Sequence, residues 1–195
     1  MKKKGELIIV SAPAGTGKTT LVHKLKEEYP EIVVQSISCT TRKPRVGEID
    51  GKDYVFLTDE AFEKRADRGE FIEYATVFGH QYGTSKELVK SQCMDGKHVI
   101  LVIDTQGAME LKKKTKALYI FIAPPSMEVL EERLKNRKTE SPETLKNRLK
   151  WAQYEMDQAK HYDYTIVNDD LETAYEALKS IILAKNYEGG NHGTR

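Results

Sequence analysis

The chain has 195 residues, 39% of them hydrophobic and 31% charged, which is enough for one domain with a sizeable core. Its 31 Lys and Arg residues almost balance its 30 Asp and Glu residues, and a net charge of +1 favours neither nucleic acid nor an anionic membrane surface as a partner. No apolar run approaches the length that spans a bilayer. Cys39 and Cys93 lack metal-binding spacing, so we expect free thiols in a reducing cytoplasm.

The chain opens on a strand, a loop of small residues and a helix. Residues 7–10 are apolar and predict a strand, and residues 19–29 have the apolar spacing of an amphipathic helix that Pro30 stops. The loop between them, residues 12–17, curls so that successive N–H groups point at one anion. The helix start adds its unsatisfied N–H groups and its positive dipole end. This unit predicts a phosphate-binding loop rather than an ordinary strand-to-helix turn.

Two side chains at the end of this loop suit phosphate chemistry. Lys18 would supply a point charge for the terminal phosphates of a nucleotide, and the Thr19 hydroxyl could join the coordination shell of Mg²⁺. The strict phosphate-loop pattern has Gly where this chain has Ala12. Alanine fits there if the backbone does not need a positive φ.

The rest of the chain alternates between strand and helix patterns. Further strands are expected at 32–37, 54–57, 71–78, 98–103, 117–122 and 164–167. Further helices are expected at 60–67, 85–94, 108–114, 127–138, 142–160 and 171–185. Asp59 could cap the helix at 60–67, and Asp50-Gly51 is a hairpin turn signal that makes residues 54–57 the returning strand. This order predicts an α/β fold with a parallel sheet between helices, and residues 188–195 read as a disordered tail.

Residues 38–45 carry two arginines and a lysine beside hydroxyl groups. Because guanidinium groups match phosphate oxygens bidentately, Arg42 and Arg45 predict a second anion site, for an acceptor phosphate. A solvated hairpin is the alternative, and it would be favoured if the phosphate loop were not present.

Glu73 lies within an expected strand. Strict alternation places Phe71 and Glu73 on one face, with Ile72 and Tyr74 on the other. An exposed strand carboxylate is the simple interpretation. The functional one is base recognition, because a buried carboxylate accepts the adjacent N1–H and amino donors of guanine, which adenine lacks.

Asp104 and three arginines complete the candidates. Asp104 follows a buried strand, so it is expected at the ligand edge of the sheet, unless it is only a helix N-cap. Arg133 and Arg137 are four residues apart on one helix face, and Arg148 lies on the next helix. They predict a lid that closes over a transferring phosphate, against the alternative of a solvated charged face.

Taken together, these residues resemble the guanylate kinases, the ATP:GMP phosphotransferases, over residues 5–185. The motifs that carry the resemblance are Ser38-x-Thr40-Thr41-Arg42-x-Pro44-Arg45-x-Gly47-Glu48, Gly51-x-Asp53-Tyr54-x-Phe56, Glu70-Phe71-Ile72-Glu73, Tyr82-Gly83-Thr84, Asp104-x-Gln106-Gly107, Ile122-Ala123-Pro124-Pro125-Ser126 and Ile166-Val167-Asn168-Asp169. The resemblance implies a P-loop nucleoside monophosphate kinase fold. Its parts would be a core at 5–34 and 95–185, an inserted β-rich GMP-binding lobe at about 35–84, a helical lid at about 126–160 and a tail at 186–195.

The resemblance also implies residue roles. The ATP site would comprise Ala12, Pro13, Ala14, Gly15, Thr16, Gly17, Lys18, Thr19 and Asn168, the last at the adenine. The GMP site would comprise Ser38, Arg42, Arg45, Tyr54, Glu73, Tyr82, Thr84 and Asp104. Lys18, Arg42, Arg133, Arg137 and Arg148 would be catalytic, and Thr19 would bind Mg²⁺.

The implied reaction is phosphorylation of GMP, and also of dGMP, to the diphosphate by ATP and Mg²⁺, within purine nucleotide metabolism and GMP recycling. No nucleic acid, membrane or obligate protein partner is implied. The family often has a second acid where this chain has Val102, which leaves Asp104 to serve the metal, the base or both. Ala14 replaces a common serine.

Two alternatives stay open. One is a guanylate-kinase-like protein-binding module, in which the phosphate loop is degraded, whereas Lys18 and Thr19 are present here. The other is a kinase of the same scaffold acting on a compound such as ribose bisphosphate, which Glu73 argues against.

Overall fold

The computed structural model describes residues 4–77, 79–136 and 142–187. Its core is a five-stranded sheet in the order β2-β7-β1-β8-β9, in which every neighbouring pair is parallel. These strands are β1 (Leu7–Ser11), β2 (Val33–Gln35), β7 (His98–Val102), β8 (Leu118–Ala123) and β9 (Tyr164–Val167). The parallel α/β fold expected from the sequence is thereby confirmed.

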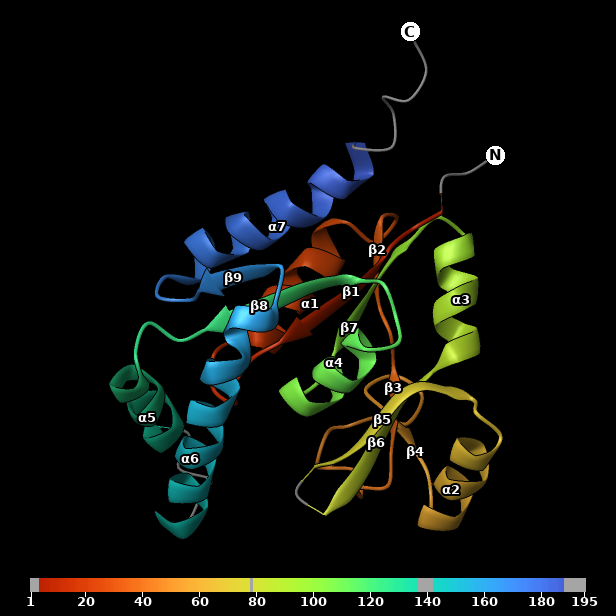
Figure 1. The fold of residues 1–195 in the computed structure, drawn as a ribbon, viewed down its shortest axis with the longest axis horizontal. Coiled ribbons are helices and arrows are strands. Elements are labelled where there is room, and N and C mark those ends of the chain that lie inside the picture. The colour runs from red at the N-terminus through yellow and green to blue at the C-terminus, as the bar shows by residue number, and fades with distance from the viewer. Residues whose placement is uncertain (1–3, 78, 137–141, 188–195) are drawn as a thin grey trace, which may run out of the picture.

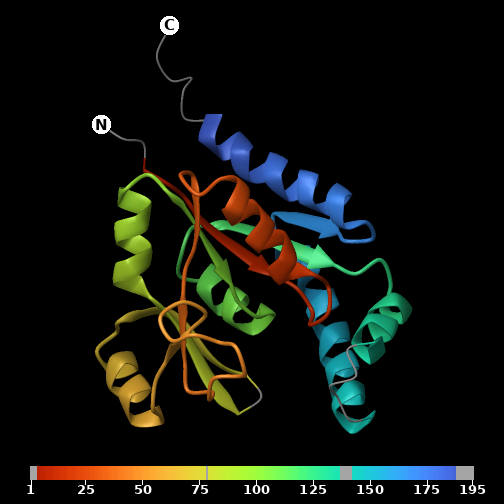
Figure 2. The ribbon, with the colours of Figure 1, turned by 180° about the vertical axis from the view of Figure 1, so that it is seen from behind.

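Helices cover both faces of this sheet (Figures 1 and 2). Successive side chains of a strand point to opposite faces, so Ile8 packs with α1 (Lys18–Glu28) and α7 (Leu171–Tyr187), while Ile9 packs with α3 (Lys86–Met94) and α4 (Thr105–Lys112). The strand residues that take part in these two clusters are almost fully buried. This double coverage explains why the core strands read as continuous apolar runs.

A second, four-stranded sheet has the order β4-β3-β6-β5. Its strands are β3 (Ser38–Thr40), β4 (Val55–Phe56), β5 (Phe71–Val77) and β6 (His80–Ser85). The helix α2 (Asp59–Asp67) packs on one face through Phe62, which stacks on Phe71 beside Cys39. The other face carries Tyr82 and other residues of the cavity described below.

The sequence analysis misassigned three features of this sheet. The strand expected at 32–37 contains only β2, which ends at Gln35, and the separate strand β3, which begins at Ser38 in the other sheet, was missed. The strand β6 was missed. The hairpin at Asp50-Gly51 is wrong, because β4 runs parallel to β3. The turn there is local instead: Gly51, at φ +74°, donates its N–H to the carbonyl of Tyr54 at 2.7 Å.

Two further helices project from the core on the same side as the second sheet (Figure 1). They are α5 (Met127–Asn136) and α6 (Pro142–Gln158), which pack together through Leu130, Leu134 and Ala152. A short 3₁₀ helix, η1 (Ala159–His161), leads from α6 to β9. Among the described residues, no helix combines the length and apolarity needed to cross a membrane. The expected tail at 188–195 lies outside them.

The helix α2 is capped by Thr58 rather than by Asp59. The Thr58 hydroxyl accepts a hydrogen bond from the N–H of Ala61 at 3.2 Å, and Thr58 has the extended backbone of an N-cap residue. Asp59 is the first helical residue and contributes only its charge near the positive end of the helix dipole.

Thr58→Ala is therefore expected to lower the free energy of unfolding by about 1 kcal/mol, the usual worth of an N-cap side chain. Asp59→Ala should cost only about 0.3 kcal/mol, because it removes one exposed charge at the helix start. Urea unfolding of both variants measures this difference. A larger loss in Asp59→Ala than in Thr58→Ala would show that Asp59 is the cap.

Candidate active site

The candidate site lies where β1 and β7 end side by side. The two strands pair in parallel, with Val10 opposite Val102, so their carboxyl ends meet at one edge of the sheet. The loop at residues 12–17 leaves β1 at this edge, and Asp104 follows β7 there. This is the edge at which open α/β sheets bind ligands.

The loop has the backbone of an anion cradle. Gly15 and Gly17 have φ of +92° and +85°, values that side chains with a Cβ rarely adopt, and Gly17 occupies the N-cap position of α1. The Thr16 hydroxyl donates to the carbonyl of Pro13 at 2.9 Å, which closes the turn from within. Residues 13–20 line a small hollow of about 160 Å³. Its form supports the sequence prediction of a phosphate site.

Asn168 follows β9 and is held against this loop. Its side chain is buried and donates from Nδ2 to the carbonyl of Thr16 at 2.6 Å. A Cβ on Gly17 would lie 2.6 Å from the same Nδ2 atom, so the close approach requires glycine. Asn168 thus supports the loop directly, and its contact with adenine stays a prediction.

The Lys18 side chain folds back over the loop, and its Nζ atom lies 3.4 Å from the carbonyl oxygen of Ala12. Desolvation lowers the pKa of Lys18, while the negative charges of Glu155 and Asp104 raise it. Asp104 accepts a hydrogen bond from the N–H of Gly107 at 2.6 Å, so it caps α4. It also lines the cavity described in the next paragraph. Asp104 is therefore both a helix N-cap and a residue at the ligand edge of the sheet, the two interpretations that the sequence offered.

A cavity of about 250 Å³ joins this loop to the second sheet. It brings together many of the residues singled out in the sequence. Those on its wall are Lys18, Thr19, Ser38, Tyr54, Glu73, Tyr82 and Asp104. The loop supplies one end of the cavity and the second sheet the other, so the space has the form of two sites that face each other.

Glu73 reaches this cavity because β5 is irregular. The register between β5 and β6 shifts between Phe71 and Glu73, so Phe71 pairs with Ser85 and Glu73 pairs with Thr84. Adjacent residues of β6 point to opposite faces, so Phe71 faces α2 and Glu73 faces the cavity. The prediction that both share one face is wrong, and the irregularity is the physical reason.

The Glu73 carboxylate is buried and prepared to accept further hydrogen bonds. The Thr84 hydroxyl donates to its Oε1 at 2.6 Å. Burial, with a smaller contribution from the charge of Asp104, raises the pKa of Glu73 to about 7, while the hydrogen bond from the Thr84 hydroxyl opposes the rise. Ser38 pairs with Thr84 across β3 and β6. Ser38 and Glu73 line one end of the cavity, whereas Thr84 is fully buried and does not line it.

The predicted acceptor-phosphate residues lie on one side of the second sheet. Arg42 donates to a carboxylate oxygen of Glu48 at 2.8 Å and lies over the Tyr54 ring, 5.4 Å from its centroid. The rings of Tyr54 and Tyr82 are in edge contact at 6.1 Å. Arg45 is exposed, with its backbone N–H bonded to Glu48 at 2.7 Å.

Two of the three predicted lid arginines, Arg133 and Arg148, do not line the cavity. Arg133, on α5, donates to the backbone carbonyls of Asn168 at 2.9 Å and Asp169 at 3.4 Å. Arg148 lies half-buried on α6, and neither arginine lines the cavity. Arg137 lies outside the described residues.

One functional candidate was missed by the sequence analysis. Glu155, on α6, is only 4% exposed, accepts a hydrogen bond from the Thr105 hydroxyl at 3.0 Å, and is electrostatically coupled to Lys18. In the sequence it stands among many charged residues of a helix, and no motif signals it. Only the packing of α6 against the start of α4 could reveal it.

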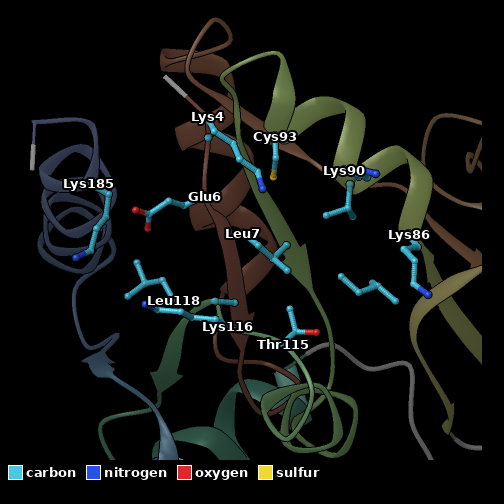
Figure 3. Close-up of a pocket in the computed structure, with 14 residues that line it drawn as sticks. Lys4, Glu6, Leu7, Lys86, Lys90, Cys93, Thr115, Lys116, Leu118 and Lys185 are labelled. Carbon is cyan, nitrogen blue, oxygen red and sulfur yellow. The ribbon is translucent and has the colours of Figure 1, made fainter. Parts of the chain in front are cut away.

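A larger cavity, of about 690 Å³, lies elsewhere (Figure 3). It is lined by the amino ends of β1 and β8, at Leu7 and Leu118, and by lysines that include Lys86, Lys90 and Lys116. None of the predicted site residues lines it. It is at the wrong edge of the sheet for the chemistry of the phosphate loop.

Mg²⁺ requires few protein ligands in a site of this kind, because phosphate oxygens and water complete its shell. The described ranges contain no group of three or more His, Cys, Asp and Glu residues arranged to hold a metal ion. The Thr19 hydroxyl at the start of α1 and the Asp104 carboxylate line the same cavity and are oxygen donors, which fits Mg²⁺ held mainly by a nucleotide.

The parallel sheet, the phosphate loop and the facing polar pocket define a P-loop phosphotransferase. The family model described as guanylate kinase matches residues 4–185. The chain belongs to the guanylate kinase family, and it is an enzyme of that family.

Individual relatives agree with the family model. A guanylate kinase of Protochlamydia amoebophila is 54% identical over 183 residues, covering 94% of this chain and 92% of the relative. One of Clostridium perfringens is 46% identical over 93% of this chain and 84% of its own length. The crystal structure of guanylate kinase from Anaplasma phagocytophilum superposes with a TM-score of 0.77 at 36% identity, covering 94% of this chain and 87% of that one.

The raised pKa of Glu73 predicts a pH effect on stability without nucleotide. The pKa in the folded protein, about 7, exceeds the ordinary 4.5, so the native state binds this proton more tightly than the unfolded state. The stabilisation is present below the lower value and is lost as pH rises through 7. Glu73→Gln removes this dependence. Its free energy of unfolding relative to the parent protein should rise by about 1–3 kcal/mol between pH 5 and 8.

Urea unfolding of both proteins at several pH values measures this difference. Subtracting the two curves cancels other titrating groups, including Glu155. A difference that stays constant from pH 5 to 8 would contradict the raised pKa of Glu73.

Proposed function

We propose that the cavity and the loop are the acceptor and donor sites of one reaction, ATP + GMP → ADP + GDP. The observation that carries this assignment is the cavity itself, which has the phosphate-loop lysine, Lys18, at one end, and at the other Ser38 and Glu73, the latter hydrogen-bonded to Thr84. Membership of the guanylate kinase family supports GMP as the acceptor.

The donor triphosphate binds at the loop. Backbone N–H groups around Gly15 and Gly17 surround its phosphates, and Lys18 moves from the Ala12 carbonyl to the terminal phosphates. Thr19 would hold Mg²⁺, and Asp104, on the wall of the same cavity, would offer a further oxygen donor. When bound, Mg²⁺ neutralises charge on the phosphate oxygens. Asn168 keeps the loop in place and lies beside the adenine.

The acceptor binds in the part of the cavity formed by the second sheet. Glu73 accepts the guanine N1–H and amino donors, with Ser38, Thr84 and Asp104 around the base. Arg42, Arg45, Tyr54 and Tyr82 bind the acceptor phosphate. Because the ionised form of Glu73 is the acceptor, GMP binding should lower its pKa. No group on this wall is assigned to the ribose 2′-OH, so dGMP is also an acceptor.

Transfer needs no strong base, because an oxygen of the GMP phosphate is already an anionic nucleophile. Lys18 lines the cavity at the loop, and Arg42 lies over the ring of Tyr54, which lines it on the second sheet. Closure of the lid at residues 126–160 would add Arg133, Arg137 and Arg148. In this assignment residues 35–84 form the GMP-binding lobe, and residues 5–34 and 95–185 form the core that carries it.

The buried free thiols of Cys39 and Cys93 support a reducing cytoplasm as the compartment.

The protein-binding alternative has less support. A binding module has no use for a lysine desolvated beside two carboxylates, as Lys18 is here with Asp104 and Glu155. A kinase for a non-purine acceptor would have no use for buried Glu73. The site as a whole suits two small-molecule substrates.

The experiment that tests the proposal measures ADP formation from ATP and Mg²⁺ with GMP, dGMP, AMP, UMP or no acceptor. Turnover with GMP and dGMP but not with AMP is expected. Equal turnover with AMP would overturn the assignment of Glu73. The absence of turnover with any acceptor would overturn the assignment of the cavity and the loop as acceptor and donor sites.

Glu73→Gln is expected to lower kcat/KM for GMP by about a hundredfold, the loss of charge-assisted hydrogen bonds to two guanine donors. The amide still accepts at one atom, but its NH₂ faces a donor of the base. The KM for ATP should not change, because the donor site lies at the other end of the cavity. Steady-state kinetics with each substrate varied measures both values.

Glu63→Gln is the matched control. It removes an exposed carboxylate on α2, away from the cavity, and should leave both KM values unchanged. GMP turnover by Glu73→Gln at the parent rate and KM would contradict base recognition by Glu73.

A further inference from the structure

Gly107 is a glycine inside a helix, where glycine is the least favourable residue apart from proline. It is the third residue of α4, it is buried, and its φ is not positive. Alanine would adopt the same backbone conformation with a smaller loss of chain entropy. The backbone of α4 therefore does not call for glycine here, and the reason must lie in what surrounds the residue.

A side chain at this position would meet two carboxylates. A Cβ on Gly107 would lie 3.1 Å from Oε2 of Glu73 and 3.3 Å from Oδ1 of Asp104. Both distances are shorter than a relaxed van der Waals contact, which is roughly 3.5 Å. The missing Cβ thus leaves the space in which these two acids approach the same turn of α4.

Neither partner of this contact can move away easily. The helix α4 packs against β5, and its buried residues Ala108 and Leu111 belong to the hydrophobic core. Glu73 is held from its other side, because its Oε1 accepts the Thr84 hydroxyl at 2.6 Å. A methyl group at position 107 would therefore be accommodated mainly by displacing the Oε2 end of the Glu73 carboxylate.

The position of Oε2 matters because guanine presents two adjacent donors. In the proposed function, one oxygen of Glu73 accepts the N1–H of the base and the other accepts its exocyclic amino group. Both hydrogen bonds depend on the direction of the carboxylate as well as on its distance from the base. Displacing one oxygen would weaken one of the two bonds more than the other.

We propose that Gly107 is a positioning residue for guanine specificity: without a side chain there, the Glu73 carboxylate rests against α4 with both oxygens available to the base. The inference rests on the proposed role of Glu73 in binding GMP. A glycine needed only for packing would occupy the same place, but its replacement would affect stability and the binding of both substrates alike.

Gly107→Ala adds the single methyl group. We expect the KM for GMP to rise about tenfold and the KM for ATP to stay within about twofold of the parent value. Inosine monophosphate (IMP) keeps the N1–H donor but lacks the amino group, so its inhibition constant against GMP should change less than the KM for GMP. Steady-state kinetics with each substrate varied, and with IMP as inhibitor, measures all three values. A parent KM for GMP, or an equal rise for GMP and IMP, would contradict the inference.

The double variant Glu73→Ala/Gly107→Ala tests the contact itself. It does not depend on Gly107→Ala folding, because removal of the carboxylate leaves room for the methyl group. Compared with Glu73→Ala alone, the double variant should have the same kcat/KM for GMP and an unchanged or higher melting temperature. A further tenfold loss of kcat/KM would show that Gly107 acts independently of Glu73, against the inference.

Glu110→Ala is the matched control on the same helix. Glu110 is exposed and ion-paired with Lys113, so this variant should keep the parent KM for both substrates. Glu73→Gln separates the two levels of the argument. A parent KM for GMP in that variant would overturn the role of Glu73, and the inference with it. An impaired Glu73→Gln together with a parent KM for GMP in Gly107→Ala would overturn the inference alone.

Discussion

The parallel pairing of β1 with β7 determines where everything else in the site lies. Because Val10 and Val102 are neighbours in register, the chain leaves both strands at one edge. One exit becomes the phosphate loop, and the other places Asp104 beside it. The strands are covered on both faces, so this edge is held by the core rather than by the loops. The second sheet then needs only to face this edge to form the cavity.

Charge burial is the second constraint on the site. Lys18 is desolvated, and the acids that support its charge, Asp104 and Glu155, are themselves buried enough to have raised pKa values. Glu73 has the same shift at the other end of the cavity. Without a bound nucleotide, the free-energy cost of desolvating these charged groups is only partly offset by their neighbours. A nucleotide that brings donors to Glu73 and phosphates to Lys18 would relieve this cost, so binding energy depends on the fold having already desolvated the groups.

The sequence was sufficient for the core and for the local motifs. Apolar strand runs, a glycine-containing loop and strand-to-helix alternation are local patterns, and they correctly led to the parallel sheet and to the edge where Asp104 lies. The second sheet was harder, because β3, β4 and β6 are short strands whose pairing is decided by distant partners. The Asp50-Gly51 turn was a correct local signal, but the direction of β4 depends on β3, which lies about fifteen residues earlier in the chain.

Glu73 and Glu155 show why the site was only partly predictable. Strict alternation placed Glu73 beside Phe71, whereas one register shift in β5 reverses that relation and turns the carboxylate to the cavity. The base selection proposed for Glu73 therefore depends on this backbone irregularity, on whose opposite face Phe71 stacks on Phe62. The buried environment of Glu155 depends on the contact of α6 with α4, where Glu155 meets Thr105, a residue fifty positions earlier in the chain. In both cases a carboxylate acquires its chemistry from long-range packing, which composition and spacing do not encode.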